Sequence, residues 1–394
     1  MLHLTAPVSC NIVLADKSTK HIMSLGQWKE ILAKLNQANE FRIYGFEAWF
    51  QAQKSLSVTE DELFSFFSEL DKMGKCFHIY LDSASSYSSF RYDRFFTALL
   101  NCSYLGSTIF TFSGKGSLAA EPGWSALEEA SAAGFDTGAS ILLTMHSLEE
   151  VGDLTDEALD GGASLVIFER VRPSEQEKID LEAFKRGAAK IYELRQLGTE
   201  VSLSGCFPNC FSQGDIPSCL AGTVSCAITP EGTLRPCRYA SASGCLDLIS
   251  CSLSEAWQSP ALEKWRLLTS ETCQGCAKCN LCPGGCLLYT YESNSAQSDP
   301  FITGQIDEET VLQEVTLEDE LCPVPCYNVR EEDFGWLLMR GSRVIPVSSK
   351  AGPVLARFTG KVTLGEIEQE FGAGALSFIY SLYVRGFIEL KETI

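Results

Sequence analysis

Residues 273–286 read Cys273-Gln-Gly-Cys276-Ala-Lys-Cys279-Asn-Leu-Cys282-Pro-Gly-Gly-Cys286. A second pattern, Cys219-x12-Gly232-x4-Cys237, lies upstream, and fourteen of the seventeen cysteines fall between residues 206 and 326. Thiolates that lie this close in sequence can share one metal centre, which isolated cysteines cannot do. The spacing therefore predicts iron–sulfur clusters in the middle of the chain.

The composition is that of an ordinary soluble protein, with 45% hydrophobic and 21% charged residues in 394. That length predicts two or three domains. No run approaches the ~20 apolar residues of a membrane helix, and the start does not resemble a secretory signal. We therefore expect a cytoplasmic protein whose thiols bind metal rather than form disulfides. A net charge of −20 argues against nucleic acid as a partner and would suit a basic peptide or protein.

The first 204 residues alternate between strand and helix patterns. Ser24 with Gln27, and Thr59 with Glu62, form capping boxes ahead of apolar residues at helical spacing. A long helix is expected from about 174 to 197. Strand patterns lie at 41–44, 76–81, 108–112, 138–144 and 164–168. This rhythm predicts an α/β fold with parallel strands. About six units are too few to close a barrel, so we expect a partial (β/α)6 TIM-like barrel over residues 1–204.

The cysteine spacings and their flanks resemble the SPASM domain of radical S-adenosylmethionine (SAM) enzymes that modify peptides. The matching flanks are Cys219-Leu-Ala-Gly222, Ile228-Thr-Pro-Glu-Gly232, Ala256-Trp257, Lys264-Trp265-Arg266 and Cys282-Pro-Gly-Gly-Cys286. The resemblance covers about 105 residues and assigns 205–326 to a SPASM domain.

In that family, a Cys-x3-Cys-x2-Cys motif at the end of the first strand holds the [4Fe–4S] cluster that binds SAM. The corresponding place in this chain has Cys10, but Leu14 and Lys17 stand where the second and third thiolates should be. The family's Gly-Gly-Glu-Pro motif is replaced by Gly45-Phe46-Glu47-Ala48, with a ring in place of the second glycine. The resemblance therefore implies a barrel that neither binds nor cleaves SAM.

The resemblance also implies two auxiliary [4Fe–4S] clusters. The first would use Cys219, Cys237 and Cys286, with Cys210 expected as the fourth ligand and Cys206 as the alternative. The second would use Cys273, Cys276 and Cys282, closed by Cys322 or Cys326, of which Cys322 is preferred. Cys279 makes a ferredoxin-like run and could replace one of these ligands. Zinc remains an alternative metal. The other five cysteines, outside these patterns and away from Cys10, are expected to be small buried residues: Cys76, Cys102, Cys226, Cys245 and Cys251.

Residues 327–394 contain no cysteine and predict a small winged-helix-like α+β domain. Two strand patterns, Trp336–Met339 and Arg343–Val347, flank a turn at Gly341-Ser342, and Thr363 with Glu366 forms a capping box. The ending resembles the PqqD-like recognition element for ribosomally made, modified peptides (RiPPs). That element implies leader-peptide binding at these residues: Arg343, Val344, Ile345, Val347, Leu376, Ile379, Tyr380 and Tyr383. Eight Lys/Arg balance eight Asp/Glu here, which disfavours DNA binding.

These features favour a non-catalytic subunit that pairs, as a heterodimer, with an active radical SAM/SPASM protein and binds the precursor peptide's leader. An electron-transfer protein that feeds such an enzyme is the main alternative. An active enzyme with an unusual SAM site and a free-standing peptide-binding scaffold are the other two hypotheses. Whether the clusters act as structural elements or as electron carriers is left open by the sequence.

Overall fold

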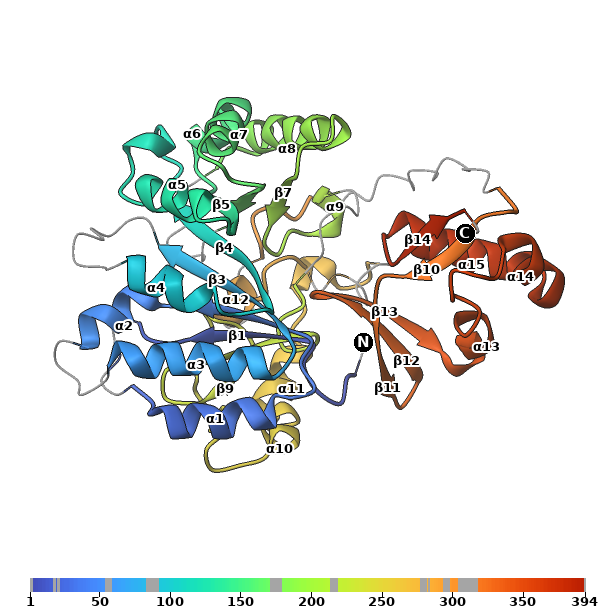
Figure 1. The fold of residues 1–394 in the computed structure, drawn as a ribbon, viewed down its shortest axis with the longest axis horizontal. Helices are drawn as coiled ribbons and strands as arrows, with labels where there is room; N and C mark the ends of the chain where they lie inside the picture. The colour runs from blue at the N-terminus through green and yellow to red at the C-terminus, as the bar shows by residue number, and fades with distance from the viewer. Residues whose placement is uncertain are drawn as a thin grey trace. The chain divides into compact units, whose positions relative to one another are not determined.

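The computed structural model describes residues 3–16, 19, 22–53, 59–82, 92–170, 179–212, 219–276, 282, 284–292, 298–303 and 318–392. The chain forms two compact units, Met1–Glu308 and Glu309–Ile394 (Figure 1). The cysteine-rich segment, which the prediction assigns to its own domain from residue 205, adds two strands to the sheet of the first 204 residues. Cys322–Pro325, which the prediction includes in that domain, forms a strand that pairs with Ile388–Lys391 of the second unit.

The first unit is built on a nine-stranded sheet in the order β7-β6-β5-β4-β3-β2-β1-β8-β9. Strands β1 to β8 are parallel to their neighbours, and β9 is antiparallel to β8. Their bounds are β1 Ser9–Val13, β2 Glu40–Tyr44, β3 Cys76–Asp82, β4 Leu105–Phe112, β5 Asp136–Leu142, β6 Leu165–Glu169, β7 Val201–Ser204, β8 Ser225–Ile228 and β9 Leu234–Arg235. The predicted parallel α/β fold is confirmed, and residues 1–204 supply strands β1 to β7, where about six strand–helix units were expected.

Helices connect consecutive parallel strands, as the alternating pattern predicts. They are α1 Leu25–Lys34, α2 Phe46–Gln53, α3 Glu60–Lys72, α4 Tyr92–Leu99, α5 Trp124–Ala132, α6 Met145–Glu149, α7 Val151–Asp160 and α8 Leu181–Gln196. Both predicted capping boxes are present, at Ser24 and Thr59. Helix α8 starts later than expected, because the Asp180 side chain accepts the Ala183 N–H and fixes the helix start there. Residues 174–178 of the predicted helix lie outside the described residues.

The strand order places the connecting helices on one face of the sheet. Consecutive strands are neighbours, and right-handed crossovers in one direction place their helices on one face. Alternate residues such as Phe41, Ile43, Phe77 and Ile79 are fully buried in the hydrophobic core that includes Trp28 and Phe66 of the helices. The residues between them, including Tyr44 and Tyr80, point to the other face, as the period of two requires.

The cysteine-rich segment covers part of the first unit with short elements. They are α9 Asn209–Ser212, α10 Leu253–Trp257, α11 Pro260–Arg266 and α12 Leu287–Glu292, beside β8 and β9. Trp257 Nε1 donates to the Leu4 carbonyl at 2.8 Å, and Trp265 Nε1 donates to the Ala221 carbonyl at 3.0 Å. The tryptophans of the predicted motif flanks are therefore structural anchors.

The second unit contains a three-stranded antiparallel sheet in the order β11-β12-β13, a two-stranded sheet β10-β14, and helices. Their bounds are β10 Cys322–Pro325, β11 Asn328–Glu332, β12 Gly335–Arg340, β13 Arg343–Ser348, α13 Gly352–Leu355, α14 Leu364–Phe371, α15 Ala373–Val384 and β14 Ile388–Lys391. The predicted hairpin and the capping box of Thr363 are confirmed. Over the described residues of both units, no helix has the length and apolar character needed to cross a membrane.

Candidate metal centre

Four cysteines from separate parts of the first unit converge into one group, named here the first thiol group: Cys206, Cys219, Cys237 and Cys286. They pack with Trp265, Leu287 and Leu288. Hydrogen bonds with the Cys219 and Cys286 thiols, followed by burial, raise the pKa of Cys206 well above its ordinary value. Burial raises the pKa of Cys237 to about 11, and the charges of Cys219 and Cys286 add to that shift.

Backbone donors also point at this group. The pKa of Cys219 is lowered, first by the hydrogen bond from the Cys206 thiol and then by the backbone N–H groups of Ala221 and Leu287. The Tyr239 N–H donates to the sulfur of Cys237 at 3.5 Å. Hydrogen bonds to sulfur favour the thiolate and are a known means of tuning iron–sulfur clusters. The donor set therefore fits a cluster with four thiolate ligands.

The fourth member of this group is Cys206, the alternative ligand, and not Cys210, the preferred one. Cys206 comes two residues after β7, and Arg170 Nη1 donates to its carbonyl at 3.0 Å. Cys210 lies one turn further along, in α9, where its carbonyl accepts a hydrogen bond from Thr303 Oγ1 at 2.9 Å. The two spacings to Cys219 gave no means of choosing, because the approach of Cys206 to Cys219 and Cys286 is a long-range contact of the folded protein.

A second thiol group consists of Cys210, Cys273, Cys276 and Cys282. Burial raises the pKa of Cys273 to about 11, and the charges of Cys282, Cys210 and Cys276 raise it further. Gly284, at φ +103°, lets its loop approach this sulfur, because a Cβ there would lie 3.1 Å from Cys273 Sγ. Three of the four residues are the predicted second-cluster ligands, and Cys210 joins them.

The other predicted ligands of the second cluster are placed differently. Cys279 lies outside the described residues. Cys322 and Cys326 belong to the second unit, where Cys322 is part of β10 and the Cys326 N–H donates to the Phe387 carbonyl at 2.8 Å. Their role at the cluster stays a prediction. Among the described residues, no three Cys, His, Asp or Glu side chains are arranged to hold a single metal ion. A [4Fe–4S] cluster needs a wider arrangement of ligands than a single ion, because its four thiolates bind four separate irons.

A buried ion pair connects the end of β6 to the two segments that carry Cys206 and Cys286 of the first thiol group. Arg170 follows β6 and binds Asp299 in a bidentate pair, with N–O distances of 2.7 and 3.0 Å. Asp299 also accepts the Cys286 N–H at 2.7 Å. The Arg170 guanidinium lies over the rings of Phe207, Tyr289 and Phe301. No local pattern in the sequence predicts this pair, apart from an arginine directly after a strand.

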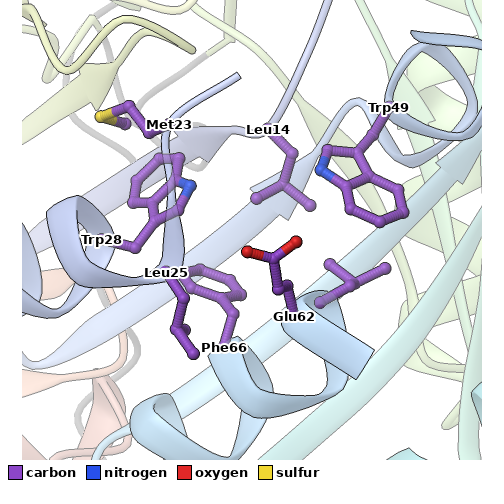
Figure 2. A pocket seen from close by; sticks show the side chains of 8 residues that line it. Leu14, Met23, Leu25, Trp28, Trp49, Glu62 and Phe66 are labelled. Carbon is purple, nitrogen blue, oxygen red and sulfur yellow. The ribbon is translucent and has the colours of Figure 1, made fainter. Parts of the chain in front are cut away.

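The end of β1, where the resemblance places the SAM cluster, is filled by apolar side chains. Leu14 is 2% exposed and lines a pocket with Trp28, Trp49 and Phe66. Figure 2 shows the Leu14 side chain between the two tryptophans, with the Glu62 carboxylate pointing into the same space. The free volume is about 20 Å³, room for about one water molecule. Lys17 lies outside the described residues.

Cys10 does not stand at this strand end, which corrects its place in the predicted motif. It is the second residue of β1, is fully buried, and faces the helix side of the sheet. Its sulfur lies 3.5 Å from that of Cys226, the residue opposite it on β8. The alternation of strand residues fixes this direction, so the Cys10 thiol points into the core instead of toward the loop after β1.

The residues after β2 are also part of the packing. Gly45 has φ +83°, and a Cβ there would lie 2.1 Å from the Ala15 carbonyl oxygen. Phe46 is buried, and its ring centroid lies 5.9 Å from that of Phe67 and 5.5 Å from that of Phe95. Glu47 accepts a hydrogen bond from Gln51 Nε2 at 2.7 Å. Phe46 therefore packs against helices α3 and α4.

A polar network, also missed from the sequence, lies on the face of the sheet opposite the core. Arg238 forms an ion pair with Glu169 of β6 and lies 4.3 Å above the Tyr44 ring. Tyr44 stacks on Tyr80 at 4.5 Å, and Ser140 Oγ donates to Glu169 at 2.8 Å. Burial raises the pKa of Tyr44 well above its ordinary value. Proteins of the α/β class bind ligands at the carboxyl ends of their parallel strands. In this protein, the side chains at these strand ends bind one another.

The eight predicted peptide-contact residues are divided between surface and core. Strand β13 is an edge of its sheet. Ile345, Val347 and Ile379 belong to the hydrophobic core of the second unit, so their side chains hold the fold together. Tyr383 is exposed, and Arg343 donates to the Arg385 carbonyl near the end of α15. Val344, Leu376 and Tyr380 are partly exposed.

Comparison with known proteins agrees with this geometry. The SPASM iron–sulfur cluster-binding domain matches residues 219–283, which contain five of the eight grouped thiols. No curated protein sequence matches the chain. The fold is similar to Streptococcus suis SuiB bound to its precursor peptide SuiA, with 12% identity, a TM-score of 0.59, and 76% of this chain and 77% of that chain covered. SuiB bound to S-adenosylmethionine gives 13%, 0.58, and 76% of each chain. At these identities the likeness concerns the fold.

Proposed function

We propose that this chain is a non-catalytic iron–sulfur subunit of a radical SAM enzyme that modifies a ribosomally made precursor peptide. One observation carries the proposal. The cysteine-rich segment brings eight thiols into two groups, whereas the strand end that should bind SAM is filled by Leu14 and its apolar neighbours. We infer that the parallel sheet is a partial (β/α) barrel that has lost its SAM-binding cluster.

The residues present fit two [4Fe–4S] clusters. The first would be held by Cys206, Cys219, Cys237 and Cys286, and the second by Cys273, Cys276, Cys282 and a fourth thiolate. Bound clusters would supply one-electron transfer or, as structural elements, part of the folding free energy of the cysteine-rich segment. The Arg170–Asp299 pair positions the Cys206 and Cys286 segments for the first cluster through the Cys206 carbonyl and the Cys286 N–H.

Three features of the barrel support the absence of SAM chemistry. Cys10 faces the core and cannot ligate a cluster after β1 without leaving its strand. Leu14 has no group that ligates iron. The Arg238–Glu169 pair and the stacked tyrosines occupy the carboxyl ends of β2, β3 and β6. The chain would thus complete or shape the active site of an intact radical SAM/SPASM partner, as a heterodimer in the cytoplasm.

The second unit supports the peptide-binding part of the proposal, as a PqqD-like winged-helix element. Among the strands that the structure describes, β13 stands at one edge of its sheet, and a leader peptide can add there as a further strand. Pro346 has no N–H, and its ring nitrogen must face away from β12, since proline is tolerated only at such edge positions. The same edge carries the backbone N–H groups of Val344 and Ser348, two residues away on either side. A leader strand would therefore be held by these donors.

The deciding experiment treats the anaerobically reconstituted, reduced chain with SAM. We expect no 5′-deoxyadenosine and no heat of SAM binding, while SuiB, which has been crystallised with SAM, serves as the positive control for binding. Turnover by this chain alone would contradict the proposal. Titration with a leader peptide, with and without residues 327–394, tests the second part. Binding that is unchanged after this removal would contradict it.

A further inference from the structure

We propose that Arg238 is a positioning residue for the first cluster: it attaches the segment of the Cys237 ligand to the parallel sheet, and its positive charge raises the reduction potential of that cluster. The inference rests on the proposed function for the presence of the cluster. It goes further, because it gives Glu169, a residue of the sheet, control over a cluster in the cysteine-rich segment. The sheet would then have a role that needs no SAM.

A turn that begins at the ligand directs Arg238 away from its own strand. The Ala240 N–H donates to the Cys237 carbonyl at 3.1 Å, so Cys237–Ala240 is a turn with Arg238 and Tyr239 at its two central positions. The Tyr239 N–H donates to the Cys237 sulfur at 3.5 Å. Arg235 Nη1, from β9, donates to the Ala240 carbonyl at 3.2 Å. The Cys237 thiol and the Arg238 side chain therefore belong to one hydrogen-bonded turn.

The Arg238 guanidinium is held by groups of the sheet. It forms an ion pair with Glu169 of β6 and lies 4.3 Å from the ring centroid of Tyr44 of β2. It also lies 4.5 Å from the ring centroid of Tyr239. The second oxygen of Glu169 accepts a hydrogen bond from Ser140 Oγ of β5 at 2.8 Å. One side chain thus connects the turn that carries Cys237 to three strands of the sheet.

The two charges of this ion pair should act on the cluster with opposite signs. The side chains of Arg238 and Glu169 are 17% and 15% exposed, so solvent screens their charges less than those of a surface pair. Reduction adds one negative charge to a [4Fe–4S] cluster, and nearby charges and hydrogen bonds to sulfur set its potential. The positive charge of Arg238, one residue from a ligand, stabilises the reduced cluster. Glu169 offsets part of that charge and lowers the potential.

Charge and packing predict different outcomes for the two partners. If Arg238 acted by packing alone, loss of Arg238 and loss of Glu169 would have the same effect, because each breaks the same ion pair. A role of charge predicts shifts of opposite direction, since the partners carry opposite charges. Lysine at position 238 keeps the charge but lacks the planar fork that pairs with a carboxylate and stacks on a ring. Arg238→Lys therefore separates charge from geometry.

The test uses the full chain, reconstituted anaerobically with iron and sulfide, and follows its electron paramagnetic resonance signals during a reductive titration. The signal that is absent from Cys237→Ala identifies the first cluster. For that signal we expect a lower midpoint potential in Arg238→Gln than in the wild type, and a higher one in Glu169→Gln. Arg238→Lys should lie closer to the wild type than Arg238→Gln does. Arg94→Gln, which removes a guanidinium that pairs with Glu60 on the helix side, is the matched control and should shift neither cluster.

Opposite shifts in Arg238→Gln and Glu169→Gln support the inference. Shifts in the same direction overturn it, as does loss of iron from both variants, which would show a role in packing alone. Circular dichroism and iron content show whether each variant is folded and loaded. If Arg238→Gln holds no iron, Glu169→Gln decides: a raised potential supports the inference, and an unchanged or lowered one overturns it.

The outcome for the wild type separates this inference from the proposed function. A wild type that binds no cluster after reconstitution overturns both together. Wild-type clusters whose potentials are the same in Arg238→Gln and Glu169→Gln overturn the inference alone.

Discussion

Arg170 and Asp299 face each other in a bidentate ion pair whose side chains are 3% and 0% exposed. Asp299 also accepts the backbone N–H groups of Cys286 and Phe301, and Arg170 donates to the Cys206 carbonyl. The pair therefore joins the end of β6 to the two segments that supply the first thiol group. Each partner is 129 residues from the other, so the contact exists only in the folded protein.

Removal of either partner should destabilise the protein strongly. Arg170→Ala leaves a buried carboxylate without its cation, and breaking a buried pair costs about 3–5 kcal/mol. The free energy of unfolding, measured by anaerobic denaturant titration, should fall by that amount, and iron content should fall with it. Lys190→Ala, which breaks an exposed pair with Glu193, is the control and should change stability by less than about 1 kcal/mol. Equal effects in the two variants would contradict the structural role of Arg170.

Restoring the two missing cysteines should not restore a SAM cluster. The double variant Leu14→Cys/Lys17→Cys recreates the family spacing in sequence, but Cys10 points into the core beside Cys226. Two thiols cannot replace the three that such a cluster needs. Iron per chain should therefore equal that of the wild type, and no 5′-deoxyadenosine should form. A gain of about four irons would show that Cys10 can leave its strand.

His78 should make stability dependent on pH. Burial lowers the pKa of His78, with the Glu40 charge opposing the shift, and Nδ1 accepts the Ser107 N–H at 3.0 Å. The folded state thus holds a neutral imidazole, while the unfolded chain takes up a proton below about pH 6.5. The stabilisation that neutral His78 gives to the folded state is fully present above about pH 6.5 and is lost as the pH falls below it.

The matched variant for this prediction is His78→Gln, which keeps a hydrogen-bond acceptor but cannot titrate. Between pH 7.5 and 5.5 the wild type should lose more of its free energy of unfolding than the variant, because all other titrating groups are shared. Parallel pH profiles for the two proteins would contradict the assignment.

The edge position of β13 in its described sheet allows a test of peptide addition that spares the fold. Val344→Pro removes an N–H on the edge where Pro346 already lacks one, and leaves the bonds to β12 in place. Loss of one backbone hydrogen bond, together with the wider proline ring, should weaken leader-peptide binding about tenfold, measured by calorimetry. Tyr383→Ala tests whether the exposed ring on α15 contributes as well. Normal affinity in Val344→Pro would place the peptide elsewhere.

Gly45 should be intolerant of any side chain. Gly45→Ala places a Cβ 2.1 Å from the Ala15 carbonyl oxygen at φ +83°, and should cost more than about 1–3 kcal/mol, the range for backbone strain alone. Gly134→Ala is the matched control, because its φ is +88° and no atom lies within 4 Å of the added carbon. The difference in melting temperature between the two variants isolates the close contact. Similar melting temperatures would show that the Ala15 backbone can move aside.

Local signals predicted much of this structure. The capping boxes at Ser24, Thr59 and Thr363 fix helix starts through short-range hydrogen bonds, and the sequence alone identifies them. The direction of the Cys10 side chain was not predictable, because it depends on where β1 begins. The choice of Cys206 for the first thiol group was not predictable either, because it depends on contacts with Cys219 and with the distant Cys286. Long-range contacts such as Arg170 with Asp299 leave no local pattern.

The pairing of β1 with β8 has a consequence for the order in which the protein can be made. Cys10 and Cys226 of these neighbouring strands are 216 residues apart, so β1 keeps one edge uncovered during synthesis until Ser225–Ile228 emerges from the ribosome. Contacts this distant in sequence slow folding and leave strand edges open to mispairing during synthesis. Nascent chains should therefore depend on chaperones until the segment that carries the thiols is complete.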